Sequence, residues 1–233
     1  MIADIGAAVF RYRNAMFPVA SLLILLPGPP LFTNGAVAML AGLFVALVGQ
    51  CIRATTIGFD YIIRGGRDGH VYAKGLVTGG MYQVCRNPMY VGNILILAGL
   101  AIAANTWACL VIALLAFVFF FVAIVAAEER FLEGRFGAGY RDYMKAVPRW
   151  LPSLAIWRSS RQGSGSIHWR RILVKEYGTP MGWWLLLIFA SWVQLRRGGQ
   201  LERHQDLFQA LLIAGAALGV AWIVIRVLKK SRR

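Results

Sequence analysis

The sequence predicts an all-α, polytopic integral membrane protein with about six transmembrane helices. Of its 233 residues, 58% are hydrophobic, and the mean hydropathy is +0.60. Several apolar runs approach the length of about 20 residues that a helix needs to cross a bilayer. The basic residues are concentrated in the segments that flank alternate runs, a pattern typical of membrane topology. No separate soluble domain is visible between the runs.

The first two runs predict two helices near the start of the chain. The first span must extend either back past Arg11 and Arg13 or onward through the three prolines in the stretch 27–30, which would kink it, and we favour a span near residues 12–32. Residues 35–54 form a clear second span that carries Gln50 and ends at Arg53. Gln50 and Arg53 could face a ligand, but an arginine at the end of a span more commonly extends its charged head into the interface, and we expect this of Arg53.

A helical hairpin follows a polar, glycine-rich loop over residues 55–85. Pro88 stands where the first turn of a helix tolerates proline, directly before the apolar run 89–104. The chain then turns at Asn105 and Thr106 and returns as the run 107–127. These two runs are long enough for two antiparallel spans, so the chain should come back to the membrane face from which it started.

Two further apolar runs, residues 181–195 and 207–228, complete the predicted set of spans. The first of them is short and has tryptophans near its ends, as in an aromatic belt. The chain is thus divided into an N-terminal pair of spans (1–57), a central core (58–152), and a basic loop with the last two spans (153–233).

The distribution of Lys and Arg predicts the orientation in the membrane. Of 25 such residues, all except Arg196, Arg197 and Arg203 lie on one side of this six-span arrangement. The positive-inside rule then places both termini and the loops before and after the hairpin in the cytoplasm. Membrane topology also explains the net charge of +15 better than nucleic-acid binding, because the chain has no basic stripe interleaved with aromatic residues.

The hairpin brings two chemically distinct segments to one membrane face. A Gly/aromatic loop ends in Arg86 before the first helix, and Glu128 and Glu129 follow the second. The paired Gly79 and Gly80 would allow the backbone to approach a ligand closely. We therefore expect a site that combines a fixed cation, two carboxylates and exposed backbone groups.

An interfacial amphipathic element should follow the acidic pair. Leu132, Phe136, Tyr140 and Tyr143 recur at helical spacing, while the glycines at 137 and 139 predict two short helices with a break. Such an element can cover the site as a moving lid. The next segment, which includes Arg149 and Trp150, then ends the helix and returns these side chains towards the site.

Two sequence blocks carry a resemblance to a known family. The first is Arg86-Asn87-Pro88-Met89-Tyr90-Val91-Gly92, and the second comprises Glu128-Glu129, Leu132, Phe136-Gly137, Tyr140, Tyr143, Val147-Pro148-Arg149 and Pro152. Together, over about residues 75–152, they resemble the isoprenylcysteine carboxyl methyltransferase and phospholipid methyltransferase superfamily. The resemblance implies S-adenosylmethionine as methyl donor, bound in a cytosolic pocket between the blocks. One position departs from the family pattern, which commonly has histidine where this chain has Asn87.

The chemistry of that cofactor agrees with the residues available. Its sulfonium and ammonium groups call for carboxylates and aromatic faces, its carboxylate for an arginine, and its adenine for an apolar wall with backbone partners. The catalytic candidates are Arg86, Glu128 and Glu129. The candidate cofactor-binding residues are Leu76, Val77, Tyr82, Arg86, Asn87, Pro88, Tyr90, Glu128 and Glu129, and the candidate acceptor-binding residues are Tyr140, Tyr143, Arg149 and Trp150. We assign no metal ligand, because Cys51, Cys85 and Cys109 lack the spacing of a metal site.

The acceptor remains open between several chemistries. We expect a lipid or isoprenoid-type molecule in the membrane. A carboxylate acceptor is favoured because it needs no base, whereas an ammonium head group must first lose a proton. The alternatives are N-methylation of a phospholipid amine, an NADPH-dependent membrane reductase similar to the sterol reductases, and a non-catalytic membrane protein.

Overall fold

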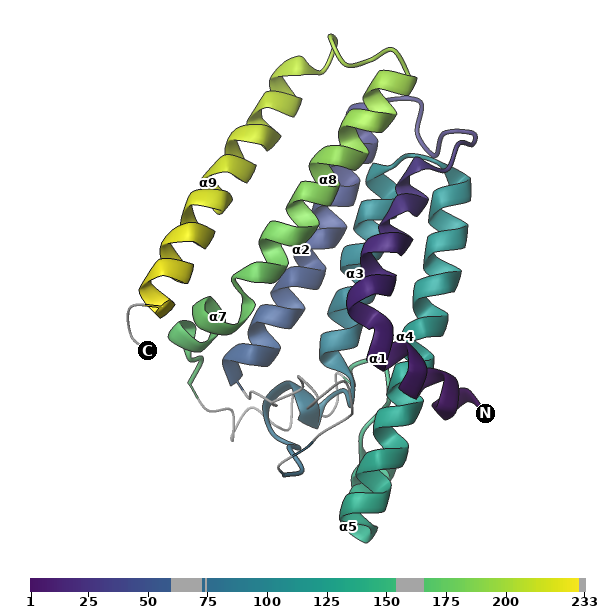
Figure 1. The fold of residues 1–233 in the computed structure, drawn as a ribbon, viewed down its shortest axis with the longest axis vertical. Helices are drawn as coiled ribbons and strands as arrows, with labels where there is room; N and C mark the ends of the chain where they lie inside the picture. Colours follow the sequence, from purple (N-terminus) through teal and green to yellow (C-terminus); the bar gives the residue numbers. More distant parts are fainter. Residues whose placement is uncertain (60–72, 74, 154–165, 231–233) are drawn as a thin grey trace.

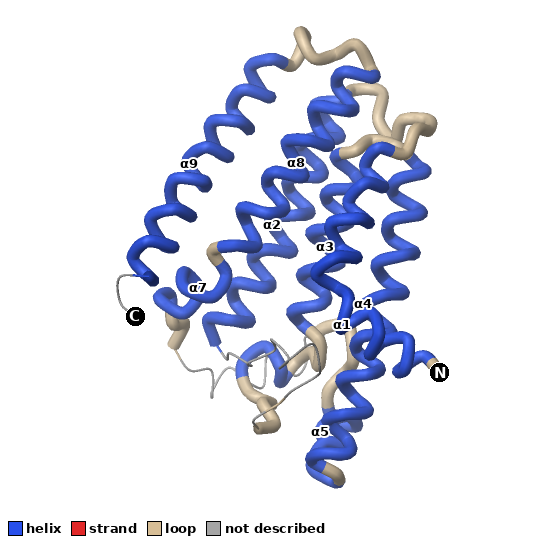
Figure 2. Tube along the Cα trace, in the orientation of Figure 1, coloured by secondary structure: helices blue, strands red, loops and turns tan. Residues whose placement is uncertain are grey.

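The computed structural model describes residues 1–59, 73, 75–153 and 166–230, and this part of the chain is helical (Figures 1 and 2). Its only β-type pairing is an isolated bridge between Pro30 and Thr106. The predicted all-α class is therefore confirmed for the described residues.

Six long helices lie side by side and make the bundle in Figure 1. They are α1 (Ile2–Ala20), α2 (Gly35–Phe59), α3 (Pro88–Ala103), α4 (Trp107–Phe136), α8 (Gly178–Arg197) and α9 (Gln205–Lys230). The shorter elements are η1 (Ser21–Leu25), η2 (Gly80–Gln83), α5 (Ala138–Ala146) and α7 (Trp169–Glu176). Of these, α5 and α7 lie towards the lower end of the bundle in Figure 1.

The lengths and compositions of the helices support a multi-pass membrane protein. Among the described helices, α2, α4 and α9 are long and apolar enough to cross a bilayer, and α3 is apolar but shorter, at 16 residues. The predicted first span at 12–32 is wrong in its bounds: α1 begins at Ile2, contains Pro18, and gives way to η1 at Ser21. Helix α8 covers the predicted fifth run with 20 residues.

The predicted hairpin of α3 and α4 is confirmed in detail. Pro88 occupies the first turn of α3, and Asn105 forms the turn in the left-handed region, with φ of 58°. The Asn105 side chain is held by Phe32, accepting from its backbone N at 2.9 Å and donating to its carbonyl at 3.0 Å. Thr106 then caps α4 by accepting a hydrogen bond from the backbone N of Cys109 at 3.2 Å.

The amphipathic element differs from the prediction at its start and at its break. Helix α4 runs without interruption past the acidic pair to Phe136, so the first of the two expected short helices is the end of a span. The chain breaks only at Gly137, whose φ of 54° favours glycine. Gly139 lies inside α5 and takes no part in the break.

Helices α2 and α3 pack backbone to backbone along a seam of four glycines, Gly42 and Gly49 in α2 and Gly92 and Gly99 in α3. A Cβ atom built on Gly42 would lie 2.5 Å from the carbonyl oxygen of Gly99, and one on Gly49 would lie 2.5 Å from that of Gly92. The reverse contacts are as close, at 2.4 Å for Gly99 and 2.8 Å for Gly92. Small residues of this kind allow membrane helices to approach closely.

The start of α1 and the end of α9 both lie towards the lower end of the bundle in Figure 1. This placement agrees with an even number of crossings. The side of the membrane on which they stand, and with it the cytoplasmic location of the termini and the site, stays a prediction. Much of the loop 55–85 and of the basic segment after residue 153 lies outside the described residues.

Candidate functional site

Two segments distant in sequence run side by side beneath the hairpin. The backbone N of Arg86 donates to the carbonyl of Pro148 at 2.9 Å, and that of Ser153 donates to Val84 at 3.1 Å. The Asn87 side chain adds a third link by donating to the carbonyl of Arg149 at 3.1 Å. The predicted meeting of the two blocks is therefore present in the structure.

The side chains of these segments converge on Glu129, which is buried. Its carboxylate pairs with Nη1 of Arg86 at 2.9 Å and accepts from Nε of Arg149 at 3.1 Å. Its second oxygen accepts from Nη2 of Arg149, so that pair is bidentate. This hydrogen bonding to Glu129 raises the pKa of Arg149. One carboxylate is thus clamped between an arginine from each block.

The clamp leaves one buried donor unsatisfied. The Nε atom of Arg86 is buried and has no hydrogen-bond partner among the described residues. A buried N–H without an acceptor costs about 1–3 kcal/mol, and more when the group is charged. A donor held in this way at a convergence of charges is suited to an anionic group of a ligand, such as a carboxylate.

Glu128 is also buried, on the neighbouring side of α4, and accepts a hydrogen bond from the hydroxyl of Tyr90 at 2.8 Å. The Tyr90 ring packs against Phe121 with ring centroids 5.4 Å apart. Both glutamates lie within α4 rather than at a solvated helix end. The protein therefore encloses both carboxylates, although the sequence predicts that they lie near the membrane face.

The remaining predicted residues surround this centre in different ways. Tyr82 is buried, and its carbonyl accepts from the hydroxyl of Tyr143 at 2.7 Å. Tyr140 is buried beside Tyr143, with ring centroids 5.9 Å apart, so α5 packs on the loop that carries η2. Leu76, Val77 and Trp150 are half-buried, and Pro88 is buried. The roles of all these residues in binding stay predictions.

A cavity of about 660 Å³ adjoins the centre within the bundle. Six elements contribute to its wall, and the lining residues are Arg13, Ser21, Arg53, Met89, Tyr90, Asn93, Ile96, Leu97, Leu100, Phe121, Ile124, Thr179, Gly182, Trp183 and Leu186. Tyr90 belongs both to this wall and to the hydrogen bond with Glu128. The cavity volume lies within the range of about 300–1,000 Å³ typical of small-molecule sites.

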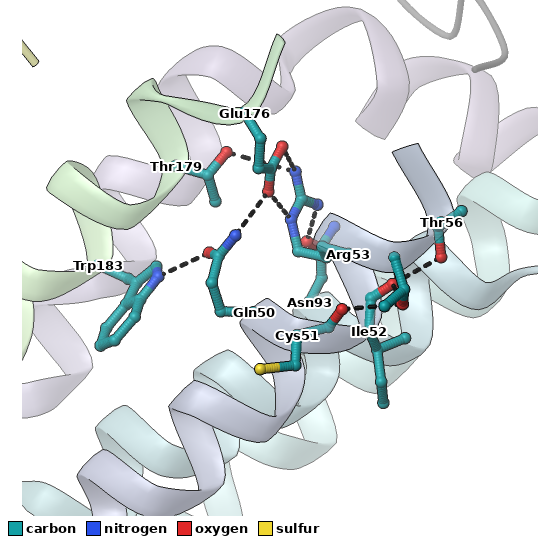
Figure 3. A network of polar contacts seen from close by, with 10 residues as sticks. Gln50, Cys51, Ile52, Arg53, Thr56, Asn93, Glu176, Thr179 and Trp183 are labelled. Atoms are coloured by element: carbon teal, nitrogen blue, oxygen red, sulfur yellow. Dashed lines mark hydrogen bonds and ion pairs between the residues drawn. The ribbon is translucent and has the colours of Figure 1, made fainter. Parts of the chain in front are cut away.

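Figure 3 shows a second polar network, which sequence reasoning missed. It borders the cavity, because Arg53, Asn93, Thr179 and Trp183 are among the lining residues. Arg53 binds Glu176 in a bidentate manner, at 2.6 Å from Nε and 2.9 Å from Nη2, and it also donates to Asn93 and Thr179. Gln50 donates to Glu176 at 3.2 Å and accepts from the indole of Trp183 at 2.9 Å.

The expectation that Arg53 extends to the interface is therefore wrong, because its side chain is only 11% exposed and paired within the protein. The spacing of Gln50 and Arg53 was an available signal, since residues three apart lie on one face of a helix. This spacing did not predict which residue Arg53 would pair with, because Glu176 lies 123 residues away in a mostly basic stretch.

The cysteines of the described residues are spread over different parts of the fold. In the part of the chain that the structure describes, no group of three or more His, Cys, Asp or Glu side chains is placed to hold a metal ion. Cys85 is buried, and its thiol donates to the carbonyl of Trp150 at 3.1 Å, while Cys109 is buried and Cys51 is exposed.

Comparison with known proteins shows which family the central part of the chain resembles. Residues 36–139 match the family described as phospholipid methyltransferase. These residues include the first block, the hairpin and the acidic pair. The predicted resemblance is therefore confirmed over this segment of the chain, which matches the phospholipid methyltransferase family.

Some of the similar proteins are named as metal-resistance proteins and others as isoprenylcysteine methyltransferases. The chain is 35% identical over 83 residues to the cobalt-zinc-cadmium resistance protein CzcN of Cupriavidus metallidurans, covering 36% of this chain and 38% of that protein. It is 33% identical over 118 residues to protein-S-isoprenylcysteine O-methyltransferase of Rattus norvegicus, covering 48% and 40%. The corresponding methyltransferase B of Arabidopsis thaliana is 31% identical over 120 residues, covering 48% and 57%. No solved structure matches significantly.

The matched segments thus span well under two thirds of these relatives' own lengths. Helix α8, which contributes Thr179, Gly182, Trp183 and Leu186 to the cavity, lies outside the family match at 36–139, and so does α1. The site consequently combines family residues with residues from the flanking parts of the chain.

Proposed function

We propose that this protein is an integral membrane methyltransferase that transfers a methyl group from S-adenosylmethionine to a lipid or isoprenoid-type acceptor in the membrane. The observation that carries the proposal is the clamp on Glu129, which joins the two blocks and leaves a buried Nε donor on Arg86. The family match over 36–139 supports the same class of chemistry.

The residues present fit the charged groups of this cofactor. The Nε donor of Arg86, which has no partner among the described residues, suits the carboxylate of the cofactor, because a charge-assisted hydrogen bond would satisfy it. Glu128 and Glu129 supply buried carboxylates for its ammonium group, and Arg149 holds Glu129 in a fixed orientation. When bound, the cofactor supplies an activated methyl group on a sulfonium.

The protein's own residues then act by positioning and by exclusion of water. Methyl transfer is a direct displacement, so its rate depends on the alignment of acceptor, methyl and sulfur rather than on a protein nucleophile. Tyr90 and Phe121 line the cavity, and the Tyr90 hydroxyl also reaches Glu128, so these two rings would form the boundary at which an acceptor in the cavity meets the cofactor. We favour O-methylation of a carboxylate, which needs no general base, over N-methylation of a phospholipid amine.

The first prediction concerns cofactor binding. Arg86→Ala and Glu129→Gln should each weaken the binding of S-adenosylhomocysteine by about 1.5–3 kcal/mol, the range for a hydrogen bond to a charged group. Isothermal titration of the purified protein measures this change. Glu133→Gln is the matched control, because Glu133 lies one turn further along α4 and is exposed. Its affinity should equal that of the wild type.

Unchanged affinity for S-adenosylhomocysteine in folded Arg86 and Glu129 variants would contradict the proposed cofactor pocket. NADPH titrated in the same way distinguishes the membrane-reductase alternative, for which NADPH but not S-adenosylhomocysteine should bind. Lipid mass spectrometry of membranes with and without the active protein then identifies the acceptor, as a species heavier by one methylene equivalent. Binding of neither compound would favour a non-catalytic role.

A further inference from the structure

Helix α7 lies between the lower ends of α2 and α9 and contacts both (Figure 1). The backbone N of His168, directly before α7, donates to the carbonyl of Gly58 at 3.0 Å, and Nη1 of Arg171 donates to that of Phe59 at 3.2 Å. Both carbonyls belong to the last turn of α2, where acceptors have no partner within the helix. The inner side of α7 therefore caps α2.

Two further side chains fix the inner side of α7. Glu176 is buried and paired with Arg53, whose own side chain reaches the cavity wall. Ile172, one turn earlier, lies over Gly58, where a Cβ built on the glycine would be 2.9 Å from its Cδ1. The position of α7 is thus coupled to the position of Arg53.

The end of α9 packs against the end of α7. The Nζ atom of Lys229 donates to the carbonyl of Val174 at 3.5 Å and lies 5.2 Å from the centroid of the Tyr177 ring. The Tyr177 and Trp222 rings are neighbours, with centroids 6.5 Å apart, and Arg226 lies over the Trp222 ring at 4.9 Å. These aromatic rings hold two cations of α9 beside α7.

The outer side of α7 combines apolar and basic side chains. Trp169 and Leu173, one helical turn apart, are 69% and 56% exposed, and Arg170 beside them is exposed as well. An exposed indole and leucine next to cations are typical of a short helix that lies in the interface of a membrane.

The charge of this surface has one sign. Basic residues are frequent in α7 and in the last two turns of α9, which together carry Arg170, Arg171, Lys175, Arg226, Lys229 and Lys230. The acidic residue of these two segments is Glu176, which is already paired with Arg53. The cations of α9 follow a long apolar run, so they stand at the depth of lipid head groups.

We infer that α7 and the end of α9 bind the head group of an anionic phospholipid. The phosphate meets the cations, while Trp169 and Leu173 enter the boundary between head groups and acyl chains. A soluble anion or a nucleic acid would leave these two apolar side chains in water, so the bilayer is the better source of the phosphate.

This lipid is distinct from the methyl acceptor, and the inference does not depend on the proposed function. Both segments lie outside the family match at 36–139 and outside the Glu129 clamp. A lipid bound at α7 holds Glu176 against Arg53 and so stabilises one wall of the cavity from the membrane surface. The state of the cavity then depends on the lipid composition of the membrane.

The second prediction tests this surface by native mass spectrometry of the purified protein. Phosphatidylglycerol should be retained in preference to phosphatidylcholine with the same acyl chains, and the preference should fall as the salt concentration rises. Arg170→Gln combined with Lys230→Gln should lower the affinity for phosphatidylglycerol by about twentyfold, because each basic residue near an anionic surface contributes about fivefold. Equal retention of the two lipids by the wild type would overturn the inference without any variant.

Arg135→Gln combined with Lys145→Gln is the matched control. Both residues are exposed cations of α4 and α5, towards the same end of the bundle, and their replacement removes the same charge. The control should keep the wild-type preference. Equal losses in the two double variants would show that net charge alone attracts the lipid, and would contradict a site at α7.

The apolar part of the surface has its own test. Trp169→Ser combined with Leu173→Ser keeps every cation, and it should still weaken the binding of phosphatidylglycerol by about tenfold. Glycerol phosphate, which carries the phosphate without acyl chains, should not displace the lipid. Displacement by glycerol phosphate would assign the surface to a soluble anion instead.

Thermal unfolding shows whether the lipid stabilises the folded protein. Phosphatidylglycerol should raise the unfolding temperature of the wild type and of the control, because it binds the folded arrangement of α7 and α9. It should have little effect on the variant that lacks Arg170 and Lys230. An equal rise in all three proteins would place the stabilising lipid elsewhere.

Discussion

Asn87 is a residue whose role in the structure differs from the one that the family pattern suggests. It stands where the superfamily commonly has histidine, and an amide cannot serve as a base at neutral pH. In this structure it is 4% exposed, and its NH2 group donates to the carbonyl of Arg149. The residue thereby helps to hold the segment that supplies one half of the clamp on Glu129. Asn87 thus acts as a structural link between the blocks.

Gly137 is the residue that separates α4 from α5. Its φ of 54° lies in the region that other residues adopt only at a cost of roughly 1–2 kcal/mol. The break allows α5 to pack Tyr140 and Tyr143 over the loop that contains Tyr82. We expect this element to serve as a lid over the site.

The third prediction uses the two glycines as a matched pair. Gly137→Ala should lower the free energy of unfolding by about 1–2 kcal/mol and lower turnover more than S-adenosylhomocysteine affinity, because it strains the hinge of the lid. Gly139→Ala is the control: Gly139 lies inside α5, and no described atom is within 4 Å of a Cβ built there. Thermal unfolding and single-turnover kinetics measure both effects. Identical behaviour of the two variants would argue against a hinge at Gly137.

At the scale of elements, the glycine seam fixes α2 against α3. Arg53 follows Gly49 by one helical turn, and Asn93 follows Gly92 directly, so the register of the seam also sets the register of the polar network. A side chain in the seam would have to separate the helices, because a backbone carbonyl oxygen of the facing helix lies within 2.8 Å of a Cβ built at each of the four glycines. The seam therefore supports the cavity wall as well as the fold.

The fourth prediction follows from that contact. Gly49→Ala should destabilise the folded protein by about 1–3 kcal/mol, the usual cost of an added methyl group in a packed interior. Gly134→Ala, in α4, is the control, since no described atom lies within 4 Å of a Cβ there, and alanine favours helix by about 1 kcal/mol. Thermal unfolding in detergent should separate the two variants. A neutral Gly49→Ala would show that the helices can part without penalty.

At the scale of the whole molecule, the cavity is lined by residues from all three parts into which the sequence analysis divides the chain. Its wall draws on α1 and α2 from residues 1–57, on α3 and α4 from 58–152, and on α8 from 153–233. The family match covers only 36–139, so a function assigned from that match alone would omit two of the cavity walls. Those three parts, as functional domains, stay a prediction.

Local patterns predicted the helical fold and the meeting of Arg86 with the acidic pair. The apolar runs with a turn at Asn105 are sufficient to bring Arg86 back to Glu129, because two antiparallel helices return the chain to its starting face. The first span was misplaced because Pro18 is tolerated inside α1 while the later prolines lie in a non-helical link.

Long-range pairing explains what the sequence could not predict. Arg53 and Glu176 are separated by 123 residues, and a charge near the end of a span looks the same whether it meets lipid head groups or a distant carboxylate. The sequence also did not reveal that α4 continues beyond Glu129. Charged residues inside a helix that other segments cover have the same sequence pattern as charged residues at a solvated helix end. Only the packing of α7 and the 148–153 segment distinguishes these cases.

The close contacts between helix backbones also determine where the bundle could admit a molecule from the bilayer. The glycine seam closes the boundary between α2 and α3, and Gly6 closes that between α1 and α4, where an added Cβ would lie 1.8 Å from the carbonyl oxygen of Ala123. A lateral gate should therefore lie between α1 and α8, which face the cavity through side chains. Gly182→Trp, at the exposed edge of the cavity, should obstruct this gate and reduce acceptor methylation in nanodiscs by about tenfold, with unchanged binding of S-adenosylhomocysteine. Gly178→Trp, on the same helix but outside the cavity lining, should not, and equal losses in both variants would place the passage elsewhere.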